Sequence, residues 1–277
     1  MKKLLMVVWV AAALVILFAV VMLRTLENRL IYFPPRYPEG FSPRNHLESE
    51  GEDVWLTTED NVRINAFYLS HPSSPKVLLW FHGNAENIGY GLARMKVLSQ
   101  IGVNILAVDY RGYGKSEGKP DEAGVYRDAD AAYDYLVKQR HIRAEDIFIY
   151  GNSLGGAVAL DLAARRPCGG LIVQSSFTSA RAMARRMFRV PLLEYVPKTR
   201  FDSLQKIRDV HAPILIAHGT RDEVVPFEMG RRLFAAASEP KRFYPIEGAG
   251  HNDVIEVGGD AYLQQLKTFV GSSHEIR

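Results

Sequence analysis

The stretch I-F-I-Y-G-N-S-L-G-G, residues 147–156, decides the fold of this chain. In it, an apolar strand, a serine between glycines and the start of a helix follow one another without a gap, which is the layout of a nucleophile elbow. The turn crowds the positions two residues before and two after the serine, so glycine is needed at both. G-x-S-x-G alone also occurs in ordinary loops. The strand expected over 146–150 and the helix expected over 154–165 favour the elbow, with Ser153 as the nucleophile.

A serine hydroxyl attacks only when a neighbouring base takes its proton and a third group orients that base. A short apolar strand over 213–217 runs into H-G-T-R-D-E, which places Asp222 just beyond the carboxyl end of that strand. Another strand, over 242–246, is followed by E-G-A-G-H-N-D, where glycines precede His251. We therefore predict that Asp222 is the orienting acid and His251 the general base.

Each assignment has an alternative. Asp222 has a second possible role as the cap of a helix that starts near Pro226, and Glu223 beside it is the alternative acid. His251 is favoured over the other histidines because it alone lies on a glycine-rich loop after the last expected strand. Its rivals, each of which suits a hydrogen-bonded structural role, are His82, His211 and His218.

The segment K-V-L-L-W-F-H-G-N-A-E-N supplies a fourth component of the site. Residues 76–81 form a buried-type strand, and the turn that follows it can aim backbone N–H groups at the serine. Such donors stabilise the negative charge that develops on the substrate oxygen and contribute about 3 to 4 kcal/mol to acyl transfer. The expected donors are the backbone N–H groups of Asn84 and Leu154. The side chain of His82 is expected to brace the loop.

Three motifs carry a family resemblance: F-H-G-N-A-E-N at 81–87, D-Y-R-G-Y-G-K-S at 109–116 and G-N-S-L-G-G at 151–156. With the chain order Ser, Asp, His, they resemble the α/β-hydrolase superfamily, and within it a branch of single-pass, membrane-anchored serine hydrolases. The resemblance covers most of 54–270. It implies an α/β-hydrolase fold with a mostly parallel eight-stranded sheet, helices on both faces and a short cap. Asp109 and Arg111 are then expected to hydrogen-bond neighbouring loops without taking part in catalysis.

The amino terminus predicts a membrane anchor. Residues 4–23 include no charged or strongly polar side chain, and twenty helical residues cover about 30 Å, the thickness of a bilayer's hydrocarbon core. A cleaved signal peptide is the alternative, but its apolar core is usually about 7 to 15 residues long, and the small residues expected at a cleavage site are missing from V-V-M-L-R-T-L-E-N at 20–28. We expect an uncleaved transmembrane anchor over 1–25, a juxtamembrane linker over 26–45 and the hydrolase domain over 46–277.

The orientation of the anchor stays open, because basic residues flank it on both sides. All the candidate site residues lie after Trp80, so the anchor is expected to tether the enzyme without taking part in its chemistry.

The candidate cap is the region at about 176–210, between the strand expected over 171–174 and the strand that starts at residue 213. Its methionines suit the binding of an acyl chain, and its arginines suit an anionic head group. The same pattern is equally that of an amphipathic helix, which packs its methionines on the core and leaves its arginines in solvent.

Composition indicates which other classes of function and site have no support in this sequence. The net charge is only +3 and no basic run is present, which gives nucleic-acid binding no support. One cysteine, Cys168, excludes an intramolecular disulfide framework and a cysteine-rich metal site. No phosphate-binding or dinucleotide motif is visible, so no cofactor and no metal are expected.

These patterns predict a membrane-anchored serine hydrolase that cleaves carboxylic esters or thioesters, including lipid-derived ones, through an acyl-enzyme. A serine peptidase of the prolyl-oligopeptidase type is the alternative enzyme, although its gating propeller has no room in 277 residues. The alternative from another class is a non-catalytic, membrane-tethered interaction module. The oligomeric state and the physiological substrate stay open.

Overall fold

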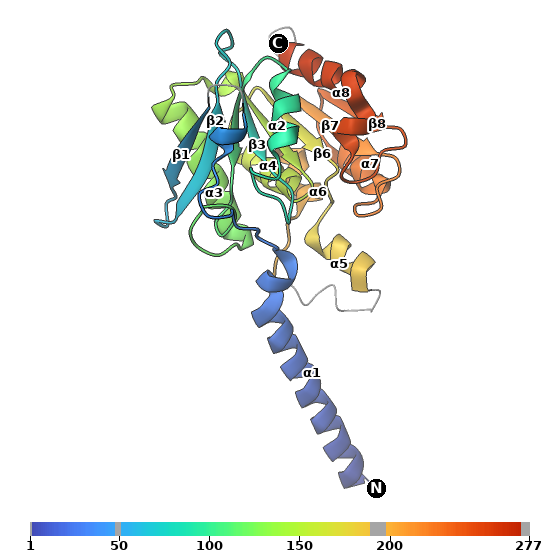
Figure 1. Ribbon diagram of the computed structural model, residues 1–277. Coiled ribbons are helices and arrows are strands. Elements are labelled where there is room, and N and C mark those ends of the chain that lie inside the picture. The colour runs from blue at the N-terminus through green and yellow to red at the C-terminus, as the bar shows by residue number, and fades with distance from the viewer. Residues whose placement is uncertain (1, 48–50, 189–197, 273–277) are drawn as a thin grey trace.

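The computed structural model describes residues 2–47, 51–188 and 198–272. Its centre is a twisted eight-stranded sheet with strand order β1-β2-β4-β3-β5-β6-β7-β8 (Figure 1). The β1–β2 and β2–β4 pairs are antiparallel and the remaining pairs are parallel, which confirms the predicted sheet. The strands are β1 Gly51–Thr57, β2 Arg63–Leu69, β3 Val77–Phe81, β4 Asn104–Val108, β5 Ile147–Asn152, β6 Gly170–Gln174, β7 Ile214–Gly219 and β8 Lys241–Ile246.

Helices cover both faces of the sheet. Helices α3, α4 and α7 pack on one face, and α2 and α8 on the other. Alternate residues of the central strands therefore enter two separate cores, with Leu79 and Ile149 in one and Leu78 and Tyr150 in the other. The helices are α1 Lys2–Ile31, α2 Leu92–Ser99, α3 Glu122–Asp134, α4 Leu154–Arg165, α5 Ala180–Phe188, α6 Ser203–Lys206, α7 Phe227–Ala236 and α8 Val254–Gly271. Short helical turns lie at Pro43–His46, Tyr135–Gln139, Ala144–Asp146 and Ile207–Asp209.

The strand order places the candidate loops at one edge. After β3 the chain crosses to β4 on one side, whereas β5 lies on the other side of β3. Connections that leave in opposite directions open a crevice at the carboxyl ends of β3 and β5, the usual ligand position in open α/β sheets. The register pairs Phe81 with Gly151 and Asn152 with Gln174, so the loops after these strands meet.

The motif at 109–116 is structural, as predicted. The guanidinium of Arg111 binds the buried carboxylate of Asp128 and both carboxylate oxygens of Asp60. Hydrogen bonds from Arg111 hold the pKa of Asp60 well below its usual range. Asp109 is fully buried and accepts hydrogen bonds from the backbone N–H of Ile88 and from a tyrosine, Tyr37. The motif therefore joins several loops on the carboxyl side of the sheet.

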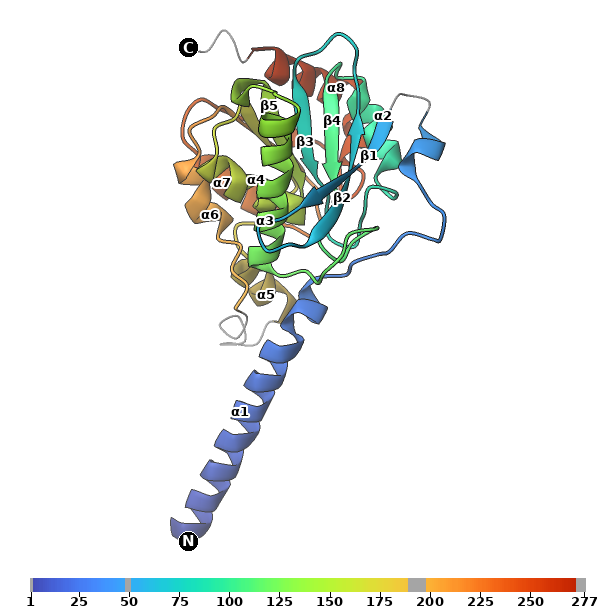
Figure 2. The same cartoon turned by 90° about the vertical axis from the view of Figure 1, so that its left-hand side faces the viewer.

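Helix α1 projects from the domain, with its N-terminal end far from the sheet (Figures 1 and 2). It continues past residue 25, the expected end of the anchor, and ends at Ile31. No helix in the described part of the chain is long and apolar enough to cross a membrane, so the prediction of a transmembrane anchor is not supported.

Residues 32–43, which we call the strap, pack against the domain where a linker was expected over 26–45. Tyr32 is 2% exposed, and Pro43 is also buried. Arg36 forms an isolated β-bridge with Gly114 and donates to the carbonyl oxygen of Ser116. The strap is therefore part of the folded domain.

Part of the predicted cap is helix α5, which lies at the same end of the domain as the C-terminal end of α1 (Figures 1 and 2). Met183 packs against the core, whereas the side chain of Met187 is 69% exposed. Arg186 donates to the carbonyl oxygen of Glu223 at 2.9 Å. The cap segment 189–197 lies outside the described residues.

Candidate active site

The elbow at Ser153 has the backbone that the sequence predicts. Strand β5 ends at Asn152, helix α4 begins at Leu154, and Ser153 between them has φ 54° and ψ −116°. A residue with a side chain rarely adopts positive φ, so the surrounding structure must enforce this conformation. A Cβ on Gly151 would overlap the carbonyl oxygen of Gly155, and a Cβ on Gly155 would overlap that of Phe81. The predicted need for glycine on both sides of the serine is therefore confirmed.

The structure brings Ser153, His251 and Asp222 into one hydrogen-bonded chain. His251 Nε2 lies 3.0 Å from Ser153 Oγ, and His251 Nδ1 lies 2.8 Å from Asp222 Oδ2. Since a carboxylate only accepts, Nδ1 carries the proton toward Asp222 and Nε2 is left to accept from the serine hydroxyl. Three residues separated by up to 98 positions in the sequence thus meet through the loops after β5, β7 and β8.

Asp222 is fixed by hydrogen bonds from several directions. Its Oδ1 accepts from the backbone N–H groups of Val224 and Val225, at 3.0 and 2.7 Å. Burial by itself raises the pKa of this carboxyl, but hydrogen bonds from His218 and His251 outweigh it and hold the pKa of Asp222 below its usual range. Asp222 is therefore an ionised acceptor, and the carboxylate next to His251 is Asp222, not Glu223.

The loop after β3 lies against the serine. A Cβ on Gly83 would be 3.6 Å from the Cβ of Ser153. The backbone N–H of Gly83 donates to Glu86 Oε2, and that of Ala85 donates to Asn84 Oδ1. Among the described residues, the backbone N–H groups of Asn84 and Leu154 have no protein acceptor. Neither predicted oxyanion donor is thus tied to another described group; Leu154 directly follows Ser153 in the chain, and Asn84 directly follows Gly83.

Two of the rival histidines lie outside the hydrogen-bonded chain of Ser153, His251 and Asp222. His82 is 1% exposed, its Nδ1 lies 2.8 Å from the carbonyl oxygen of Gly83, and its Nε2 lies 3.4 Å from Asp109 Oδ1. It braces the loop after β3, as expected. His211 is exposed on the surface.

His218 has the hydrogen-bonded structural role expected of a rival histidine, but sequence reasoning missed its contact with Asp222 and the supporting role of Asn152. His218 is fully buried, and its Nε2 lies 2.9 Å from the carbonyl oxygen of Val225 and 3.3 Å from Asp222 Oδ2. Asn152 Oδ1 accepts from Trp80 Nε1, and its Nδ2 donates to Glu86 Oε2, so it ties the elbow to the loop after β3. The spacing of four residues between His218 and Asp222 was a usable signal. Asn152 occupies the variable position of G-x-S-x-G, which gave none.

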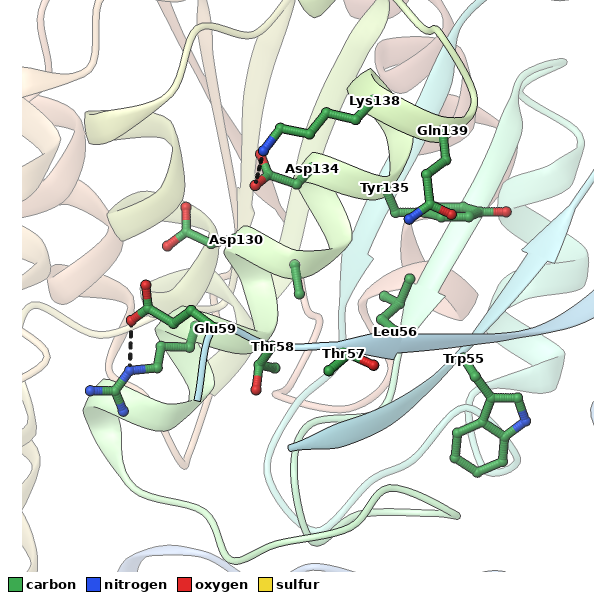
Figure 3. A pocket seen from close by; sticks show the side chains of 12 residues that line it. Trp55, Leu56, Thr57, Thr58, Glu59, Asp130, Asp134, Tyr135, Lys138 and Gln139 are labelled. Carbon is green, nitrogen blue, oxygen red and sulfur yellow. Dashed lines mark hydrogen bonds and ion pairs between the residues drawn. The ribbon is translucent and has the colours of Figure 1, made fainter. Parts of the chain in front are cut away.

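A groove elsewhere on the domain is separate from this site. It runs between β1 and α3 and is lined by Trp55, Glu59, Asp130 and Lys138 among others (Figure 3). The ion pair between Lys138 and Asp134 lies along one wall of the groove, and a second ion pair joins Arg127 of α3 to Glu59, which follows β1. In the described ranges, no group of three or more His, Cys, Asp and Glu side chains is arranged to hold a metal ion.

Comparison with known proteins gives a consistent class. The family described as serine aminopeptidase, S33, matches residues 72–205. The chain is 40% identical to α/β-hydrolase domain-containing protein 17B of Xenopus laevis over 222 residues, 77% of this chain and 73% of that protein. It is 38% identical to the human 17B protein over 222 residues, with the same coverage. The chain therefore belongs to the α/β-hydrolase family.

Two further comparisons extend this result. The chain is 35% identical to an uncharacterised protein of Mycobacterium tuberculosis over 88% of this chain and 87% of that protein. Among solved structures, an esterase of Pyrococcus furiosus has the same fold, with a TM-score of 0.72 and 22% identity over 86% of this chain and 98% of that chain. Family membership supports a hydrolase.

Proposed function

We propose that this protein is a serine hydrolase that cleaves carboxylic esters or thioesters through an acyl-enzyme. The observation that carries the proposal is the hydrogen-bonded chain from Ser153 Oγ through His251 to Asp222, at 3.0 and 2.8 Å. Nucleophile and base within hydrogen-bonding reach, with the base oriented by a third group, are the signature of an activated serine. A non-catalytic module would have no need of a strained serine aligned with a buried acid and base.

In the first half-reaction, Ser153 Oγ attacks the carbonyl carbon while its proton passes to His251 Nε2. The former carbonyl oxygen, now negatively charged, accepts hydrogen bonds from the backbone N–H groups of Asn84 and Leu154. The ionised carboxylate of Asp222 stabilises the imidazolium. The tetrahedral intermediate then breaks the bond to the alkoxide or thiolate, which takes the proton from His251, and the acyl group stays on the serine.

In the second half-reaction, water takes the place of the leaving group. His251 Nε2 removes a proton from the water as it attacks the acyl carbon, and returns that proton to Ser153 Oγ when the acid product leaves. The same two backbone donors hold the charge in this step. The site thus needs no group beyond the residues already described.

The preference for esters and thioesters over amides is tested by a substrate panel. We expect the full-length enzyme to hydrolyse p-nitrophenyl esters of increasing chain length and an acyl-thioester, with kcat/KM at least about 100-fold above that for peptide p-nitroanilides. A lysophospholipid extends the panel to lipid-derived esters. Ser153→Ala, assayed in parallel, sets the background. Faster cleavage of the anilides would assign a peptidase, the activity that the name of the matching family suggests.

We further propose that α1 attaches the enzyme to a membrane. Large apolar side chains point to solvent along the length of this helix, which in a soluble protein is unfavourable and marks a surface for lipid or protein. Those described as exposed by more than 40% are Leu5, Met6, Trp9, Val10, Leu14, Val15, Leu17, Phe18, Val21, Met22 and Leu30.

Membrane attachment is measured by flotation of the full-length protein with phosphatidylcholine vesicles. Val15→Arg with Phe18→Arg should lower the vesicle-bound fraction by at least about 10-fold, because each change removes a large apolar side chain from the membrane-binding surface and puts a charge in its place. Val257→Arg is the matched control, since Val257 is 47% exposed on helix α8, outside α1. Equal flotation of the α1 double variant and the wild type would rule out attachment through this helix.

A further inference from the structure

The side chain of Asn84 is held by the polypeptide that leads out of helix α1. Its Nδ2 donates to the carbonyl oxygen of Ile31, the last residue of α1, at 2.6 Å. Its Oδ1 accepts from the backbone N–H of Phe33 at 3.1 Å and from the hydroxyl of Tyr113 at 2.8 Å. The amide group therefore binds both sides of the junction between α1 and the strap.

These bonds act on the residue whose backbone N–H is the proposed oxyanion donor. The next residue, Ala85, has φ 55°, a conformation that a residue with a Cβ keeps only where its surroundings enforce it. Asn84 Oδ1 also accepts from the N–H of Ala85 at 3.0 Å, so the same side chain shapes the loop and ties it to the strap. Loss of the Asn84 side chain would keep the backbone N–H of residue 84 but remove the hydrogen bonds that orient it.

The C-terminal end of α1 is itself fixed to the domain. Glu27 is 6% exposed and accepts from the backbone N–H groups of Lys198 and Thr199 at 2.8 and 2.6 Å. The ring of Tyr32 packs edge-on against Phe201, with centroids 6.4 Å apart. The end of α1 and the start of the strap thus contact residues 198–201 of the cap region as well as the loop after β3.

We propose that Asn84 is a positioning residue, through which the end of α1 and the strap hold the oxyanion loop in its reactive shape. The inference rests on the proposed serine-hydrolase function. The N-terminal segment then shapes the active site in addition to acting as the tether expected from the sequence, because the oxyanion loop reaches its reactive shape only with α1 and the strap in place. A displaced donor weakens stabilisation of the tetrahedral intermediate and leaves ground-state binding of the ester unchanged.

The test is Asn84→Ala in the full chain, which retains the backbone N–H and removes the clamp. We expect kcat on a short p-nitrophenyl ester to fall by about 10- to 100-fold, with KM within about twofold of the wild type. The affinity for a trifluoromethyl ketone, whose adduct with the serine carries a negative oxygen, should fall by the same factor as kcat/KM. A merely structural role would change the amount of folded enzyme and not this affinity.

Two further variants complete the test. Tyr113→Phe removes one hydrogen bond to Asn84 Oδ1 and should cause a smaller loss in the same two quantities; it decides the question if Asn84→Ala does not fold. Ser42→Ala, which removes a bond between Ser42 of the strap and Asp53, should leave both unchanged.

Parallel losses of kcat/KM and inhibitor affinity would support the inference. An active wild type with unchanged kcat in Asn84→Ala and Tyr113→Phe would overturn the inference alone, as would a loss of kcat with unchanged inhibitor affinity. A wild type that neither hydrolyses the ester nor binds the ketone would overturn the proposed function, and the inference with it.

Discussion

Replacement of Ser153 by alanine is expected to lower kcat for ester hydrolysis by about 10⁶, the loss that removal of the nucleophile causes where a triad acts as a unit. The reason is the geometry: Ser153 Oγ is the atom that His251 Nε2 faces at 3.0 Å. Adding His251→Ala to Ser153→Ala should then cost little more, because a base without its nucleophile has no proton to remove.

The measurement is kcat of the two single variants and the double variant under identical conditions. Losses that multiply would show that Ser153 and His251 act independently. Retention of most activity by Ser153→Ala would place the nucleophile elsewhere. Either result would contradict the assignment of these two residues as partners.

Asp222→Asn should lose on the order of 10⁴ in kcat, because the amide keeps the shape of the side chain but neither fixes the correct tautomer of His251 nor stabilises its charged form. The pKa of Asp222 lies below its usual range, so the carboxylate stays ionised from roughly pH 5 to 8. The loss should therefore be of similar size throughout that interval. A loss confined to one end of it would mean that Asp222 itself titrates there.

Glu223→Gln is the matched control, since it makes the same chemical change one position along the chain. It should be nearly silent, because the carboxylate that binds His251 Nδ1 belongs to Asp222. Loss of activity in Glu223→Gln together with a silent Asp222→Asn would move the acid by one position.

The central strands and the elbow could be predicted because their signals are local. Buried parallel strands appear as continuous apolar runs, and the strand expected over 76–81 corresponds to β3, Val77–Phe81. The helix expected over 154–165 coincides with α4. The need for glycine at 151 is also local, because a Cβ there would overlap the carbonyl oxygen of Gly155; at 155 the overlap is with the carbonyl oxygen of Phe81 in β3.

What the sequence did not predict depends on contacts between distant segments. The polar and proline-rich character of 32–43 suited a linker, and nothing local indicates that Tyr32 is buried or that Tyr37 binds Asp109. The clamp on Asn84 joins residues more than fifty positions apart, so neither residue type nor spacing reveals it.

If its neighbours activate Ser153 as a nucleophile, a covalent inhibitor of serine hydrolases should form an adduct at this residue. The full-length protein is treated with a fluorophosphonate, digested and analysed by mass spectrometry. We expect a single phosphonylated residue, Ser153, with labelling abolished in Ser153→Ala and strongly slowed in His251→Ala. An unlabelled protein, or a label on another residue that persists in Ser153→Ala, would contradict the role of Ser153 as the nucleophile.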